Sequence, residues 1–169
     1  INKYFKNDIL MTNASENLSS NSMNGNIRIA SVAVATPPYC INQAQAEAFR
    51  IKHYSDSLSQ KSLSLGRKTF AHPSVLRRHL AVDDLECLVN EHPDSRIARY
   101  THWTISLSSQ AIVQALTQIG LTVDAVSGLV VNTCTGYICP GISTYLIEKL
   151  GLPDHIRAHD LVGSGCGGA

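Results

Sequence analysis

Apolar residues in the second half of the chain change between helical and strand-like spacing. Residues 104–119 carry an apolar stripe on one helix face, and Gly120 follows at the position of a helix stop. Residues 125–133 are a continuous apolar run with a polar end, the pattern of a buried strand, and residues 156–163 are predicted to be the last strand. A second helix is predicted between them over 141–151, ending at a glycine. The stripe of the first helix consists of Leu107, Ala111, Ile112, Ala115, Leu116 and Ile119.

The first half of the chain has weaker patterns. Residues 27–38 are rich in β-branched residues and end at two prolines, which predicts a buried strand and its exit turn. Residues 41–54 contain helix formers, and Asn42 is placed to cap the helix. Residues 57–70 are ambiguous and partly helical, whereas 90–100 are predicted to be a loop.

Composition divides the chain into a polar leader and one domain. Residues 1–25 are rich in Asn and Ser and poor in apolar residues, which predicts a disordered leader. Residues 26–169 form the predicted domain. Because its apolar strands alternate with helices, we expect an α/β fold with a sheet covered on both faces.

Charge and composition exclude several classes of partner. A formal net charge of +1 predicts neither a nucleic-acid partner nor a membrane surface. No apolar run reaches the roughly 20 residues of a membrane-spanning helix, and residues 1–11 lack a signal-peptide pattern. The five cysteines are odd in number and widely spaced, which favours reduced thiols in a cytoplasmic protein without a metal site.

Cys166 lies among glycines directly after the last predicted strand. Glycines allow a sharp turn and a close substrate approach, and a following helix N-terminus favours a thiolate. An ordinary thiol with a pKa of ~8.5 is only ~3% thiolate at pH 7, whereas a pKa of ~6 would make it ~90% thiolate. The alternative is a tight packing corner with an inert thiol.

Two further groups of residues are candidates for a site. Cys134 and Thr135 follow the strand at 125–133, at the end where open α/β sheets place ligands. The alternative is a plain strand-to-helix connection. The second group is basic and could hold phosphates, or could form a solvated helix face. It consists of Arg67, Lys68, Arg77 and Arg78.

Together these stretches resemble a known family. "VVNTCTGYICPGISTYLIEKLGL" followed by "DLVGSGCGGA" is similar to the N-terminal part of the chalcone and stilbene synthases, the type III polyketide synthases, and more to bacterial than to plant members. "IRIASVAVATPPYCINQAQA" resembles the opening strand and helix of that family, and "SVLRRHLAV" its short basic segment. The resemblance implies a thiolase-like layered fold, of which this chain is an incomplete N-terminal half.

The resemblance also implies a reaction. Cys166 matches the catalytic cysteine, which takes an acyl starter from coenzyme A. Malonyl-CoA is then decarboxylated, condensed with the acyl group and the product cyclised, with coenzyme A thioesters as substrates and no further cofactor. The family is homodimeric. Its His and Asn partners would lie beyond Ala169, so we expect a chain truncated after the catalytic cysteine and inactive by itself.

Other positions carry over one by one. Cys134 and Thr135 match the starter pocket. Cys139 stands where plant members have a methionine that reaches the partner's cavity, so the pocket wall is altered here. Coenzyme A phosphates are expected near Arg67, Lys68, Arg77 and Arg78. The alternatives are a ketoacyl synthase III-like enzyme with a single condensation, and a non-catalytic interaction module.

Overall fold

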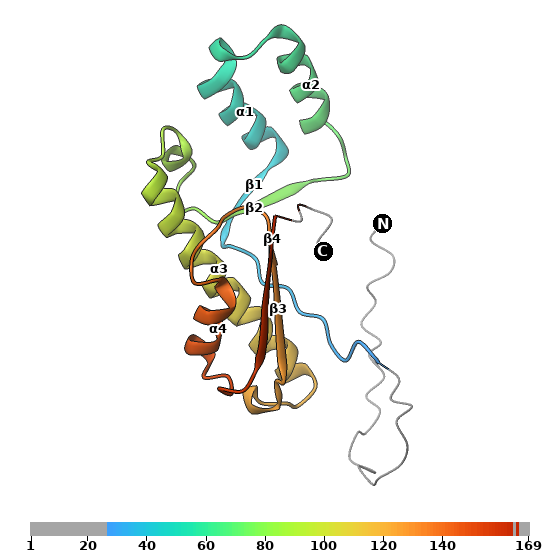
Figure 1. Cartoon of the computed structure of the whole chain (residues 1–169). Coiled ribbons are helices and arrows are strands. Elements are labelled where there is room, and N and C mark those ends of the chain that lie inside the picture. The colour runs from blue at the N-terminus through green and yellow to red at the C-terminus, as the bar shows by residue number, and fades with distance from the viewer. Residues whose placement is uncertain (1–26, 164, 166–169) are drawn as a thin grey trace.

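The computed structural model describes residues 27–163 and residue 165, so the predicted leader, residues 1–25, lies outside the described residues. The helices are α1 (Gln43–Tyr54), α2 (Gln60–Phe70), α3 (Pro93–Gln118) and α4 (Ile142–Leu150). The strands are β1 (Tyr39–Asn42), β2 (Arg77–Leu80), β3 (Gly128–Thr133) and β4 (Arg157–Val162). Figure 1 shows α1 and α2 at one end, with α3, α4, β3 and β4 in a second group.

The helix α1 begins at a capping box that the sequence predicts. The Asn42 Oδ1 atom accepts the Gln45 amide at 2.8 Å, and the Asn42 amide donates to Gln45 Oε1 at 2.9 Å. Helices α1 and α2 pack against each other, and each buries one apolar residue, Ala46 and Leu63. The ambiguous stretch at 57–70 is therefore helical over most of its length.

Strands β1 and β2 form an antiparallel ribbon at the base of these two helices. Tyr39 pairs with Leu80 and Asn42 with Arg77. The ribbon places the basic end of β2 beside the first turn of α1. Because side chains alternate along a strand, the neighbours Arg77 and Arg78 face opposite sides.

The helix α3 begins much earlier than the sequence pattern predicts. The prediction of a loop over residues 90–100 is wrong, because α3 starts at Pro93. The His92 Nδ1 atom accepts the Asp94 amide at 3.3 Å, and proline fits the first helical position because its missing N–H has no partner there. The predicted end is confirmed, since the helix stops at Gln118 and Gly120 has a φ of 67°.

The predicted order of helix, strand, helix and strand is confirmed in the second half. Strands β3 and β4 are parallel, with Gly128 paired to Arg157 and Thr133 to Val162. The helix α4 connects them and ends at Gly151, which has a φ of 62° and closes the helix in the left-handed region. This β-α-β unit makes the second half an α/β structure.

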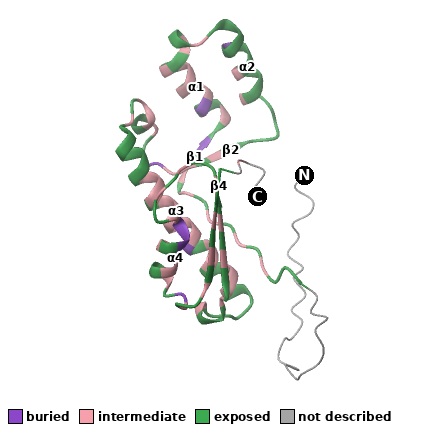
Figure 2. Cartoon of the chain, in the orientation of Figure 1, coloured by how far each residue is buried: buried purple, intermediate pink, exposed green. Residues whose placement is uncertain are grey.

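Helices cover one face of the β3–β4 sheet among the described residues, so the expectation of cover on both faces is not met there. Leu129, Val131 and Asp160 lie on the face that meets α3 and α4, and all three are partly buried. Val130 on the opposite face is 64% exposed. Figure 2 shows both strands in the intermediate and exposed colours along their length.

The predicted strand over 27–38 is wrong within the described residues. Residues 27–37 run as an extended segment that pairs with no described strand. Its burial alternates, with Ala33 and Ala35 partly buried and Val32 and Val34 exposed. The alternating pattern therefore specifies an extended backbone, whereas a strand also needs a neighbour to accept its hydrogen bonds.

The long helix α3 is amphipathic. Across the part of the chain that the structure describes, no helix combines the length and the apolar character that crossing a membrane requires.

Candidate functional site

Two candidate segments leave the sheet at the same edge. Strand β3 ends at Thr133, strand β4 ends at Val162, and these two residues are paired in the parallel register. Cys134 and Thr135 therefore follow one strand, and Gly163 follows the other, at adjacent positions. The carboxyl edge of a parallel sheet is where α/β proteins bind ligands.

The chain turns sharply after β4. Gly163 has a φ of 84° and Gly165 a φ of 58°, both in the left-handed region that favours glycine. These angles fit the predicted elbow up to the residue before Cys166. Cys166 itself lies outside the described residues, so its predicted role as nucleophile stays a prediction.

Asp160 joins β4 to the first turn of α4. Its Oδ1 atom accepts the Ser143 amide at 3.1 Å, and its Oδ2 atom accepts the Ser143 hydroxyl. The N-cap residue of α4 is Gly141, which supplies no side-chain cap. A Cβ at Gly141 would collide with the Asp160 carboxylate, so glycine is required for this approach. The carboxylate thus caps a helix from a neighbouring strand.

The predicted pocket residues lie on the loop between β3 and α4. Cys134, Thr135 and Cys139 are all exposed, and both cysteines have free thiols. Thr135 lines a cavity of about 300 Å³ together with Tyr100 and Trp103 of α3. The structure therefore places all three on one loop and joins Thr135 to a cavity against α3.

An ion pair that the sequence patterns did not indicate holds the N-terminal half of α3. Arg99 donates from Nε to Glu91 Oε1 at 2.8 Å and from Nη2 to Glu91 Oε2 at 2.7 Å. A third bond runs from Arg99 Nη1 to the Ala81 carbonyl at 3.2 Å. The Arg99 hydrogen bond lowers the pKa of Glu91 below its ordinary value of 4.5, with a smaller contribution from Arg96. The helix-start signal at Pro93 would have placed Arg99 on α3.

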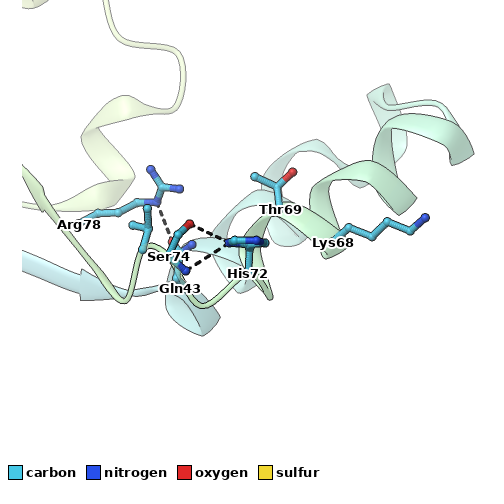
Figure 3. Close-up of a pocket in the computed structure, with 7 residues that line it drawn as sticks. Gln43, Lys68, Thr69, His72, Ser74 and Arg78 are labelled. Atoms are coloured by element: carbon cyan, nitrogen blue, oxygen red, sulfur yellow. Dashed lines mark hydrogen bonds between the residues drawn. The ribbon is translucent and has the colours of Figure 1, made fainter. Parts of the chain in front are cut away.

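The basic residues divide into two neighbouring depressions. Lys68 and Arg78 line a cavity of about 340 Å³ with Gln43 and His72 (Figure 3). Arg78 Nε donates to Gln43 Oε1 at 2.8 Å, and the guanidinium lies 5.3 Å from the centre of the Phe70 ring. These contacts fix the orientation of Arg78, whereas Lys68 extends away from His72 in Figure 3.

Arg67 and Arg77 are placed differently from that pair. Arg67 lines an adjacent depression with Glu47 and Phe70. The hydrogen bond from Arg50 lowers the pKa of Glu47, and the charge of Arg67 adds a smaller effect. Arg77 is exposed at the start of β2, on the side opposite to Arg78. The structure therefore brings Lys68 and Arg78 together, sets Arg67 beside them and separates Arg77.

Metal ligation is not indicated in the described ranges, 27–163 and 165. They contain no group of three or more His, Cys, Asp or Glu side chains arranged to hold a metal ion. The four described cysteines are all free thiols, namely Cys40, Cys87, Cys134 and Cys139.

Several known enzymes are similar to this chain in sequence. The acylalkylpyrone synthase of Aspergillus oryzae is 31% identical over 152 residues, which cover 84% of this chain and 36% of that enzyme. The phloroglucinol synthase of Pseudomonas fluorescens is 28% identical over 62% of this chain and 30% of its own length. A 3,5-dihydroxyphenylacetyl-CoA synthase of Streptomyces toyocaensis is 27% identical over 59% of this chain and 26% of its own length.

Solved structures agree with this comparison in fold. The fungal type III polyketide synthase ORAS matches 81% of this chain with a TM-score of 0.67 at 23% identity. The enzyme PKS-I of the brown alga Ectocarpus siliculosus matches 79% of this chain with a TM-score of 0.65 at 24% identity. The chain resembles the type III polyketide synthases in sequence and in fold. No protein-family model matches the chain.

The predicted α/β, thiolase-like fold class is confirmed for the part of the polyketide synthase fold that this chain covers. The chain spans between 26% and 36% of the length of these three curated relatives. The roles predicted for Cys134, Thr135, Cys139 and the basic residues stay predictions, since the contacts described above fix their positions and not their ligands.

Proposed function

We propose that this chain carries the acyl-accepting part of a type III polyketide synthase, with Cys166 as its nucleophile. The observation that carries the proposal is the pairing of Thr133 with Val162. It sets the Cys134–Thr135 pair beside the segment that leads into Cys166, at the carboxyl edge of a parallel sheet. The left-handed glycines at 163 and 165 fit a nucleophile elbow.

The proposed loading step exchanges one thioester for another. The Cys166 thiolate attacks the carbonyl carbon of an acyl-CoA starter, a new C–S bond forms, and the coenzyme A thiolate leaves and takes up a proton. In the extension step malonyl-CoA loses carbon dioxide, and its α-carbon forms a C–C bond with the bound acyl group. The Cys166 thiolate then leaves, and repeated extension precedes cyclisation.

Substrate binding is assigned to the basic residues. Lys68 and Arg78 line one cavity, and Arg78 is already oriented by Gln43 and Phe70, which supports a role in holding coenzyme A phosphates. Arg67 is adjacent, and Arg77 lies apart. The proposal includes a homodimeric, cytoplasmic enzyme that uses malonyl-CoA and an acyl-CoA starter without a further cofactor, membrane or nucleic acid.

We propose that the 169-residue chain by itself is inactive as a polyketide synthase. In the resemblance, extension depends on a His and an Asn that match none of the residues of this chain. Hydrogen-bond donors of this kind stabilise the enolate that forms on decarboxylation. A polyketide product from the 169-residue chain above the level of a Cys166→Ala variant would contradict this part of the proposal.

Acylation of Cys166 tests the central claim. The intact protein, with any residues its gene encodes beyond Ala169, is incubated with an acyl-CoA starter, and the acyl mass is assigned to a cysteine by peptide mass spectrometry. We expect acylation at Cys166, its loss in Cys166→Ser, and its retention in the matched control Cys87→Ser, at an exposed free thiol outside the predicted pocket. Equal acylation of all exposed cysteines, or none, would favour the non-catalytic alternative. In the intact protein, with any residues its gene encodes beyond Ala169, a single condensation would favour the ketoacyl synthase III-like alternative.

A further inference from the structure

Tyr100 contacts the chain on both sides of the Cys134–Thr135 pair. Its hydroxyl shares a hydrogen bond with the Thr133 hydroxyl, with Oη and Oγ1 3.0 Å apart. Its ring lies directly against Gly136, where an added Cβ would be 2.6 Å from the Cδ1 and Cε1 atoms. Residues 133 and 136 flank the pair, so one side chain of α3 holds both ends of this short bend.

Glycine at position 136 is required by this arrangement. Real Cβ atoms essentially never approach other atoms as closely as 2.6 Å, so a larger residue would displace the ring. The ring would then carry its hydroxyl away from Thr133. The ring contact and the hydrogen bond therefore depend on each other.

Tyr100 is itself held in place by its neighbours. Arg99 is fixed to Glu91 by two hydrogen bonds and to the Ala81 carbonyl by a third. These bonds anchor the turn of α3 that carries Tyr100 to the segment after β2. Trp103 follows one turn later and lines the same cavity as Tyr100 and Thr135. Tyr100 therefore holds the bend against α3, and the hydrogen bonds of Arg99 fix the position of α3 without involving the bend.

We propose that Tyr100 is a positioning residue that fixes the Cys134–Thr135 bend and thereby the shape of the starter end of the site. This inference rests on the proposed function for the identity of the ligand. Tyr100 acts through the backbone of residues 133–136, because its hydroxyl is engaged by Thr133 and its ring by Gly136. The chemistry stays with Cys166, and the affinity for the acyl starter depends on the bend.

The first test measures the bend without using catalysis. Amide hydrogen exchange of the segment 133–138 is compared in the wild-type chain and in Tyr100→Phe, which keeps the ring and removes the hydroxyl. We expect about fivefold faster exchange, the factor that corresponds to one neutral hydrogen bond. Thr133→Val should give the same effect, and the double variant should add little to either single one. Exchange in α1 should stay unchanged.

Tyr137→Phe is the matched control. Tyr137 lies on the same loop and is 71% exposed, so loss of its hydroxyl should leave exchange at 133–138 unchanged. Unchanged exchange in Tyr100→Phe would overturn the inference. Equal acceleration in α1 and at 133–138 would also overturn it, because that result reports general loss of stability.

The second test separates starter affinity from chemistry. Acylation of Cys166 is followed as a function of acyl-CoA concentration in the intact wild-type protein, with any residues its gene encodes beyond Ala169, and in its Tyr100→Phe variant. We expect a several-fold higher half-saturating concentration and a limiting rate within about twofold of wild type. An unchanged half-saturating concentration would overturn the role in starter binding. No acylation of wild-type Cys166 would overturn the proposed function, while hydrogen exchange would still decide whether Tyr100 fixes the bend.

Discussion

The Asp160 carboxylate of β4 accepts both the amide and the hydroxyl of Ser143 at the start of α4. Ser143 is only 4% exposed, so its polar groups have little access to water. The contact joins α4 to β4, the strand that follows it in the chain. It fixes the start of α4 at the end of the sheet that carries the candidate site. Its removal leaves a buried amide without a partner.

Replacement of Asp160 should therefore destabilise the chain. We expect Asp160→Ala to lower the free energy of unfolding by about 2 kcal/mol, since a buried donor loses its acceptor and α4 loses its cap. Asp160→Asn should have a smaller effect because the amide oxygen can still accept. Urea unfolding measures both, and Asp154→Ala, at an exposed position, is the control. Equal effects at positions 154 and 160 would contradict the capping role.

The ion pair of Glu91 and Arg99 predicts a dependence of stability on pH. The pKa of Glu91 is lowered in the folded protein, so its ionised form favours folding above the ordinary value of 4.5. This contribution is lost as the pH falls through the lowered pKa. The stability difference between wild type and Glu91→Gln should be largest near neutral pH and shrink in acid, as urea midpoints at several pH values would measure. A difference that is constant with pH would argue against the ion pair.

The close approach of Tyr100 to Gly136 predicts coupling between the two positions. Gly136→Ala should lower the free energy of unfolding by about 1–3 kcal/mol, because the new methyl group overlaps the ring. In a Tyr100→Ala background the same change should cost much less, since the ring is absent. Thermal unfolding of the four proteins in this cycle provides the measurement. Additive losses would show that the cost of Gly136→Ala does not come from overlap with the Tyr100 ring.

The two adjacent arginines of β2 should differ in coenzyme A binding. Arg78 lines the cavity with Lys68 and is oriented by Gln43, whereas Arg77 faces the other side of the ribbon. Arg78→Gln should weaken coenzyme A binding about tenfold, the effect of one charge-assisted phosphate contact. Arg77→Gln should change it little. Isothermal titration of each variant with coenzyme A measures the two affinities. Equal losses of affinity would indicate a general effect of positive charge and not a specific contact of Arg78.

The two adjacent valines of β3 should respond differently to the same substitution. Val130 is 64% exposed on the open face of the sheet, and Val131 meets the helices on the other. Val131→Thr should lower the free energy of unfolding by about 1 kcal/mol because a hydroxyl enters an apolar contact. Val130→Thr should leave stability within ~0.5 kcal/mol and raise solubility, because less apolar surface is exposed. Greater destabilisation by the Val130 change would reverse the assignment of the faces.

Short-range signals in the sequence predict much of this fold. The cap at Asn42, the glycines at 120 and 151 and the apolar run of β3 each act through a few neighbouring residues. The first part of α3 was harder to predict, because its residues are polar and exposed and the apolar stripe begins only later. The helix starts at Pro93, and proline is common both at the first position of a helix and in loops, so this residue alone does not predict the start.

The sequence predicts which strands carry the candidate site, but it does not predict the side-chain contacts within the site. The position of Cys134 and Thr135 after β3 follows from the order of the elements. The contacts of Tyr100 with Thr133 and Gly136 join residues more than thirty positions apart, and no periodicity encodes such a pair. The division of the basic residues likewise depends on the pairing of β1 with β2, which places Gln43 against Arg78.

Thr133 and Asp160 lie on the same face of neighbouring strands, and each bonds to a different helix. In the described part of the chain, the side-chain hydrogen bonds from this sheet to helices α3 and α4 are therefore gathered at its carboxyl end. At the opposite end, Gly128 and Arg157 are exposed and are paired through the backbone. Thermal fraying of the sheet should begin at this end, because no side-chain hydrogen bond among the described residues joins it to α3 or α4. The carboxyl end, which leads into Cys134, should open last.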